Sequence, residues 1–158
     1  MGTRSTIALE FADGTVEQVY CHWDGYLEHN GKILFEHYSD PFKLRDLIDQ
    51  GGISSLGKVI GKKHPFGPAY NETNIAKQAK VQKEVDEARE AGYTTFYARD
   101  RGEDLTKEQF VDFQDYLAHH QYEEYEYILR KDGNWYVKCH DAAYELLVLA
   151  LDNQKEEA

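Results

Sequence analysis

Residues 5–23 read STIALEFADGTVEQVYCHW, and this stretch decides the fold of the N-terminal part of the chain. Apolar residues occupy every second position from Ile7 to Phe11, which is the period of a β-strand. Asp13-Gly14 is a dipeptide typical of a tight turn, and residues 16–22 follow it as a return strand. The stretch therefore predicts a β-hairpin.

Two further segments extend the predicted sheet. Residues 122–139, centred on Asp132-Gly133, predict a second hairpin, and the β-rich stretch YTTFYARD (93–100) predicts one extra strand. Apolar periodicity and capping residues predict helices within residues 26–38, 39–52, 75–92, 105–120 and 140–154. We therefore expect an α+β fold, in which an antiparallel sheet built from two hairpins plus an extra strand has helices packed on one face.

The chain has 158 residues, and we expect residues 1–158 to form a single domain. Residues 53–74 contain three glycines, two prolines and three lysines, which predicts a long Gly/Pro/Lys loop. Long loops in compact domains are usually functional or disordered. From about residue 153 the sequence predicts a frayed tail.

The charge of the chain is strongly acidic and unevenly distributed. The net charge is −11, with −5 in residues 1–50, +2 in residues 51–100 and −8 in residues 101–158. An acidic surface repels the phosphate backbone, so we expect no general nucleic-acid binding. Such a surface keeps a protein soluble, and it can also imitate nucleic acid.

The two cysteines and the hydropathy indicate the compartment. No CxxC pair and no N-terminal apolar run of the signal-peptide type occur. The longest apolar stretch, residues 146–151, is too short to span a membrane. We therefore expect a cytoplasmic protein without a membrane partner, with both thiols reduced.

Candidate ligand contacts come from arginines, lysines and aromatic residues near predicted strand ends and in the predicted Gly/Pro/Lys loop of residues 53–74, which we call the basic loop. Arginine forks and lysines bind phosphate, and aromatic rings stack on bases. The glycine amides of the loop could help to hold an anion. The candidate ligand-binding residues are Arg4, His22, Trp23, Tyr26, Lys62, Lys63, Tyr97, Arg99 and Arg101.

The sequence contains no signature of a known catalytic or metal site. Its seven histidines form no HxH or HExxH motif, and no P-loop, GxSxG or kinase signature occurs. We therefore predict no catalytic residue, no metal ligand and no cofactor, and we favour a protein that is not an enzyme. One enzymatic alternative stays open, a small hydrolase that uses Cys21, His22 and Asp24.

Several segments carry a resemblance: MGTRSTIALEFADGTVEQVYCHWDGY (1–26), NGKIL (30–34), HYSD (37–40), KLRDLID (43–49), GGISSLG (51–57), TTFYARDRGE (94–103) and YEEYEYILRKDGNWYV (122–137). Together they resemble a family of small, uncharacterised bacteriophage proteins. The resemblance covers about two thirds of the chain. It implies a phage accessory protein, expressed in the host bacterial cytoplasm, with a role in host takeover or anti-defence.

Three functional hypotheses follow. The first is a phage counter-defence protein that sequesters a nucleotide immune signal, with Trp23 and Tyr26 against the base. The polar helix over residues 75–91 is then a candidate for contacts between subunits of a homo-oligomer. The second is an acidic inhibitor or DNA mimic that binds a host defence protein through the carboxylates of residues 103–126. The third is the Cys/His hydrolase.

Overall fold

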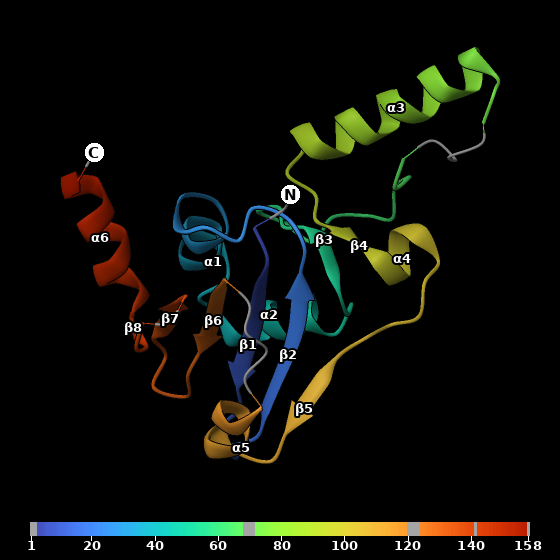
Figure 1. Ribbon diagram of the computed structural model, residues 1–158. Coiled ribbons are helices and arrows are strands. Elements are labelled where there is room, and N and C mark those ends of the chain that lie inside the picture. The colour runs from blue at the N-terminus through green and yellow to red at the C-terminus, as the bar shows by residue number, and fades with distance from the viewer. Residues whose placement is uncertain (1–2, 68–71, 120–123, 141, 158) are drawn as a thin grey trace.

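The computed structural model describes residues 3–67, 72–119, 124–140 and 142–157, and this part of the chain forms one sheet of eight strands (Figure 1). Seven strands follow in the order β4-β3-β2-β1-β6-β7-β8, and β5 pairs with β2 outside this path. Their bounds are β1 Ser5–Glu10, β2 Val16–Cys21, β3 Ile53–Ser55, β4 Thr95–Phe96, β5 Glu108–Phe110, β6 Tyr125–Leu129, β7 Trp135–Cys139 and β8 Glu145–Leu146. The predicted α+β class and the mostly antiparallel sheet are confirmed.

The centre of the sheet is built on long antiparallel pairings. β1 and β2 pair from Ser5 opposite Cys21 to Glu10 opposite Val16. Gly14 in their connection has a φ of +93°, which residues with a side chain rarely adopt. β6 and β7 also pair antiparallel along their whole length.

The arrangement of the other strands differs from the prediction. β1 pairs with β6 and β2 with β3 in parallel, so the sheet is mixed. The described residues also contain eight strands where two hairpins and one extra strand were expected. The additional strands, β3, β5 and β8, have only two or three residues each. Segments this short are too short to display a period of two.

The described residues also form one π-helix and six α-helices. Their bounds are η1 Leu27–Gly31, α1 Lys32–His37, α2 Pro41–Ile48, α3 Ile75–Glu90, α4 Tyr97–Arg101, α5 Phe113–Ala118 and α6 Leu147–Glu157. The Asp40 side chain caps α2 by accepting a hydrogen bond from the amide of Phe42 at 2.9 Å. The Asn74 side chain caps α3 in the same way, through the amide of Lys77.

Helices cover both faces of the sheet, so the prediction of helices on one face is wrong. α1, α2 and α6 pack on the face that includes Ile7, Leu9 and Val19. α5 packs on the opposite face, where Ala8 and Ile128 belong to a second apolar cluster. All six residues of β1 are buried, which means that both faces of the sheet need apolar cover.

Two predicted elements are wrong at their boundaries. The stretch 93–100, predicted as a strand, has two strand residues in β4 and continues as α4, since the buried Asp100 carboxylate accepts a hydrogen bond from the amide of Phe96. The helix predicted within residues 105–120 begins only at α5, capped by the Asp112 side chain, and β5 precedes it.

The predicted loop is corrected in part, and the residues of the predicted tail continue a helix. Residues 53–55 of the expected 53–74 loop form β3, which has partners on both sides; residues 68–71 lie outside the described part. α6 continues to residue 157, past residue 153, where the sequence predicted a frayed tail. Residues 151–157 contain no glycine or proline that would end a helix.

α3 projects away from the sheet, as Figure 1 shows at the upper right. Ala88, near its C-terminal end, is its one buried residue, and Ile75 at its start is 80% exposed. The polar helix predicted here is therefore attached to the body by its C-terminal end. Among the described helices none is long and apolar enough to cross a membrane.

Candidate functional site

The candidate site lies at the carboxyl ends of β2 and β3. Because these two strands are parallel, the segments that follow them emerge at the same edge of the sheet. The pairing continues one step beyond β2, where the amide of Trp23 donates to the carbonyl oxygen of Ser54 at 3.0 Å. The turn that carries Trp23 therefore lies directly beside the end of β3.

Backbone contacts fix this turn. Asp24 has a φ of +57°, an unusual conformation for a residue other than glycine. A Cβ atom on the buried Gly25 would lie 2.8 Å from the carbonyl oxygen of Thr3, so this position leaves no room for a side chain. The buried hydroxyl of Tyr127 donates to the Gly25 carbonyl oxygen at 2.6 Å. The turn is thus held in one conformation from below.

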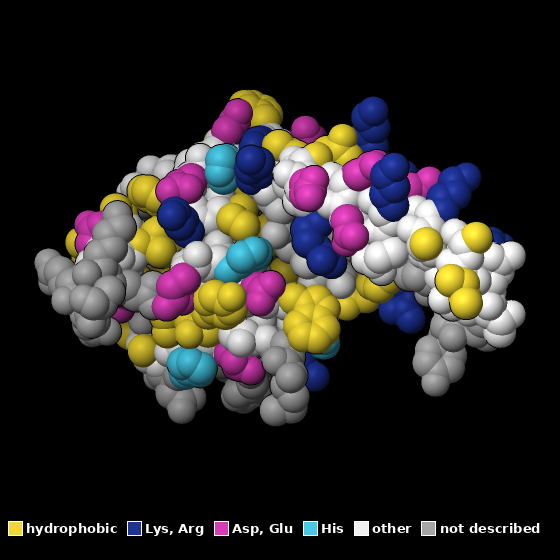
Figure 2. Space-filling view, turned by 90° about the horizontal axis from the view of Figure 1, so that it is seen from above, with side chains coloured by type: hydrophobic (Ala, Val, Ile, Leu, Met, Phe, Trp, Pro, Cys, Tyr) yellow, Lys and Arg dark blue, Asp and Glu magenta, His cyan; other side chains and the backbone are white. Residues whose placement is uncertain are grey.

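A hollow of about 380 Å³ lies between this turn, β3, β4 and α3. Its walls include Trp23, Ser54, Val85 and Thr95. A second hollow of about 410 Å³ extends along α1 and shares Asp24, Ser55, Arg89 and Tyr93 with the first. We call the two hollows the upper groove. Figure 2 looks down on this end of the molecule, where hydrophobic side chains lie among charged side chains of both signs.

Two side chains of the upper groove are available to a ligand. The Trp23 side chain is 43% exposed, whereas the other tryptophan, Trp135, is 3% exposed in the core. Arg89 is exposed on the last turn of α3 and lines both hollows. Among the described residues its guanidinium has no hydrogen-bond or ion-pair partner. Lys32 and Lys58 are further exposed cations on the α1 side of the groove, which also carries the exposed carboxylates of Glu28 and Glu36.

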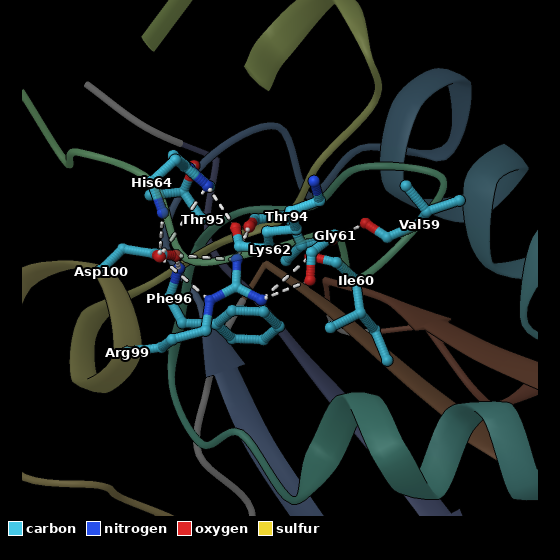
Figure 3. Close-up of polar contacts among 10 residues, drawn as sticks. All are labelled: Val59, Ile60, Gly61, Lys62, His64, Thr94, Thr95, Phe96, Arg99 and Asp100. Carbon is cyan, nitrogen blue, oxygen red and sulfur yellow. Dashed lines mark hydrogen bonds and ion pairs between the residues drawn. The ribbon is translucent and has the colours of Figure 1, made fainter. Parts of the chain in front are cut away.

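The basic loop is tied to α4 by Arg99 (Figure 3). Its Nη1 donates to the carbonyl oxygens of Ile60 (3.2 Å) and Gly61 (2.9 Å), and its Nη2 donates to that of Thr94 (3.0 Å). Nε and Nη2 also donate to the Asp100 carboxylate, at 3.0 and 3.1 Å. A guanidinium has five N–H donors. These five bonds leave none for a phosphate.

His64 and Asp100 complete this attachment. The Asp100 side chain is fully buried and accepts from the amides of His64 (3.1 Å) and Phe96 (2.9 Å). His64 Nδ1 donates to the Lys62 carbonyl oxygen at 2.9 Å, and Nε2 shares a 3.0 Å hydrogen bond with the hydroxyl of Thr95. Figure 3 shows how these side chains converge from the loop, β4 and α4. The network fixes the wall of the upper groove at Thr95.

The predicted site residues divide into those near the upper groove and those elsewhere. Trp23 lines the groove, and His22 packs edge-on against it, with ring centroids 4.7 Å apart. Tyr26 follows the same turn, and the carboxylate of Asp24 raises the pKa of its hydroxyl. Arg4 is exposed at the start of β1 and lines neither hollow.

The remaining predicted residues surround the basic loop. Tyr97 packs on Phe66, a residue of the upper groove, with ring centroids 5.7 Å apart. The Arg101 guanidinium lies 5.0 Å from the centroid of the same Phe66 ring and pairs with Glu103 at 3.4 Å. Lys62 and Lys63 are exposed and line neither hollow.

The Cys21 thiol is not suited to nucleophilic catalysis. It is fully buried, and burial raises its pKa to about 11, although hydrogen bonds from Asn30 and other neighbours oppose this shift. Roughly one thiol in ten thousand would be ionised at pH 7. His22 Nδ1 shares a 2.7 Å hydrogen bond with the hydroxyl of Tyr20 instead of contacting the thiol. Within the described ranges no three His, Cys, Asp or Glu side chains form a candidate metal cluster.

Arg89 is not among the site residues predicted from the sequence. It lies in a highly charged helix, EVDEAREAG, where an arginine usually pairs with a carboxylate one turn away. One signal was available, the glycine at position 92, whose φ of +78° ends α3 and turns the chain back toward β4. That turn brings the last turn of α3 over the end of β3.

Comparisons with protein-family models, with curated proteins and with solved structures found no match to this chain. The resemblance to bacteriophage proteins therefore stays a hypothesis.

Proposed function

We propose that the protein binds a nucleotide in the upper groove and retains it without converting it. One observation carries the proposal: the half-exposed indole of Trp23 lines the same hollow as the guanidinium of Arg89, which has no partner among the residues that the structure describes. A planar base and a phosphate are the two parts of a nucleotide that these groups bind best.

The base is assigned to Trp23. Stacking of a base on an aromatic side chain contributes about 1–3 kcal/mol, because every base has a flat π face. The indole is held by the fixed Asp24 turn and by the edge of His22, so little rotamer freedom is lost on binding. The Tyr93 ring lines the same hollow and offers a second apolar wall.

The phosphate is assigned to Arg89, with Lys58 further along the groove toward α1. The carboxylate of Asp24 and the hydroxyls of Ser54 and Ser55 suit the sugar, because they can accept or donate hydrogen bonds to ribose hydroxyls. The two adjoining hollows have room for more than one nucleotide unit. A cyclic or linear dinucleotide is therefore included in the ligand class.

We propose retention without turnover because the sequence predicts no catalytic residue. In a phage accessory protein, such binding would remove a nucleotide immune signal from the host cytoplasm. A homo-oligomer that shares α3 between subunits would close the groove further from water.

The test is a thermal-shift screen against linear and cyclic nucleotides, followed by chromatography of the recovered ligand. A ligand at 100 times its dissociation constant stabilises the folded state by about 2.7 kcal/mol, a shift of several degrees. For the nucleotide that binds, we expect Trp23→Ala and Arg89→Ala each to weaken affinity at least about tenfold. The matched control is Lys83→Ala, which removes an exposed cation from α3 and does not line the groove.

Three results would contradict the proposal. They are no shift with any nucleotide, equal affinity of the Arg89→Ala and wild-type proteins, and recovery of a converted ligand.

A second candidate function has its own support, because Glu103, Asp104 and Asp112 are exposed on the segment between α4 and α5. An acidic inhibitor acting through this segment would bind a host protein with strong salt dependence and without need of Arg89.

A further inference from the structure

A second concave surface lies at the other end of the central strands, where β1 ends and α2 begins. It is a hollow of about 310 Å³, and we call it the basal hollow. Its apolar walls are Leu9, Phe11, Pro41 and Phe42. It shares Phe11 and Arg45 with a more open depression of about 630 Å³ beside β5. None of its lining residues belongs to the upper groove.

Phe42 has no evident structural role. Its side chain is 79% exposed in the first turn of α2, although it forms part of the wall of the hollow. The cap of α2 uses its backbone amide only, so the helix does not require a phenyl ring here. An exposed aromatic ring beside an apolar hollow provides surface that a ligand can cover.

Three cations stand around the hollow, in a chain whose net charge is −11. Arg130 pairs with the buried carboxylate of Glu10 at 3.0 Å. Arg45 is exposed and lies 3.9 Å from Asp49, which is a weak surface pair. The exposed ammonium of Lys131 forms no hydrogen bond or close ion pair with the described residues, although its charge acts on the Glu10 carboxylate from further away. Within the described part of the chain, the rim therefore carries one cation without a close ion pair, Lys131, and one loosely paired cation, Arg45.

Glu10 does not cancel this positive charge. Burial opposes its ionisation, but hydrogen bonds from Arg130 and from the amide of Lys131 outweigh it and lower the pKa of the carboxyl. The carboxylate is thus ionised at neutral pH; its hydrogen bonds go to the Arg130 side chain and the Lys131 amide, and the Lys131 ammonium interacts with it only through space. Lys131 and Arg45 stay available to an anion from outside.

We propose that the basal hollow binds a small amphipathic carboxylate, with an apolar body against Phe11 and Phe42 and its carboxylate between Lys131 and Arg45. The volume is at the lower end of the range of small-molecule sites, which suits a medium-chain or single-ring acid. The mostly apolar wall and the exposed ammonium of Lys131 favour a ligand with one negative charge over a polyphosphate.

The test uses sodium octanoate as the probe and octanol as its uncharged counterpart, followed by amide chemical shifts of the full-length protein. We expect octanoate to shift the amides of Leu9, Phe42 and Lys131 in a saturable manner, and octanol to bind at least about fivefold more weakly. Lys131→Gln and Phe42→Ala should each weaken octanoate binding about threefold to tenfold. Both side chains are exposed, so neither variant should unfold, and Lys83→Gln is the control for charge.

The outcomes separate clearly. Saturable shifts at the basal hollow that require Lys131 and the negative charge of octanoate support the proposal. Equal binding of octanol, shifts confined to other regions, or unchanged affinity of both variants would overturn it. Shifts of the same amides with protein concentration alone would also overturn it, since they would identify the hollow as a contact between copies of the chain. A nucleotide that binds the upper groove should leave these amides unchanged.

Discussion

Replacing Arg99 by alanine tests whether this residue serves the fold or a ligand. The Arg99 side chain is 16% exposed and the Asp100 side chain is fully buried, so the substitution leaves a buried carboxylate without its cation. Breaking a buried pair in this way costs about 3–5 kcal/mol. Asp100 retains the amides of His64 and Phe96, which favours the lower end of that range.

We therefore expect Arg99→Ala to lower the free energy of unfolding by about 3 kcal/mol, or the melting temperature by about 6–12 °C for a chain of this size. The assay is urea unfolding followed by circular dichroism, with hydrogen exchange to detect release of the Ile60–Gly61 segment. Arg101→Ala is the matched control, because its side chain is 56% exposed and its contacts are a surface ion pair with Glu103 and the ring of Phe66. We expect this control to cost about 0.5 kcal/mol or less.

The reasoning would be refuted if Arg99→Ala lost less than about 1 kcal/mol. It would also be refuted if the variant kept full stability and lost nucleotide binding. That second result would mean that Arg99 binds phosphate, as predicted from the sequence, and gives up its hydrogen bonds to the backbone when it does so.

Three further predictions concern buried groups. Cys21 should resist alkylation in the native protein at pH 7 and react only as the chain unfolds, because burial raises the pKa of its thiol to about 11; rapid native labelling would contradict this. The pKa of Glu10 is lower in the folded state, so its contribution to stability is present above its unfolded pKa and is lost as the pH falls through the folded pKa. Glu10→Gln should therefore reduce the loss of unfolding free energy at acid pH. If urea unfolding gave the same pH dependence for the variant and the wild-type protein, the Glu10–Arg130 pair would not be the cause of that loss. Tyr127→Phe removes the 2.6 Å hydrogen bond to Gly25 and should lower the free energy of unfolding by about 1–2 kcal/mol. Because this bond holds the Trp23 turn, the variant should also bind the nucleotide more weakly than the wild-type protein.

The parts of the fold that were predictable from sequence are those that local pattern determines. Alternation from Ile7 to Phe11 and the Asp-Gly turns gave the central strands, and Asp40 and Pro41 marked the start of α2. The wrong boundaries at 93–100 and 105–120 involve partners that are distant in the sequence, His64 for the first and β2 for the second. The stretch 93–100 has high strand propensity, yet Asp100 turns its second half into a helix by bonding to Phe96, His64 and Arg99.

The candidate site shows the same limit more strongly. Residue type identified Trp23 as a stacking surface, and the structure lines the upper groove with it. Residue type could not distinguish Arg99 from Arg89, because the difference lies in their neighbours. Arg99 donates to backbone carbonyl oxygens of Ile60 and Gly61, which are distant in the sequence, and of the nearby Thr94. Arg89 is exposed on the last turn of α3, where no described residue pairs with it.

The parallel pairing of β2 with β3 is what turns two unrelated sequence features into one site. If the connection through α1 and α2 returned the chain antiparallel, the Trp23 turn and the loop after β3 would lie at opposite edges of the sheet. The glycines then determine how closely the following segments approach. A Cβ on Gly57 would lie 2.2 Å from the Gly92 carbonyl oxygen. The segment around Gly57, which leads to the basic loop, is therefore in backbone contact with the segment around Gly92, which follows α3. Gly57→Ala should therefore move α3 away from the Trp23 turn. We expect the substitution to reduce the free energy of nucleotide binding more than the free energy of unfolding, which a nucleotide titration and a urea unfolding experiment on the same variant would measure.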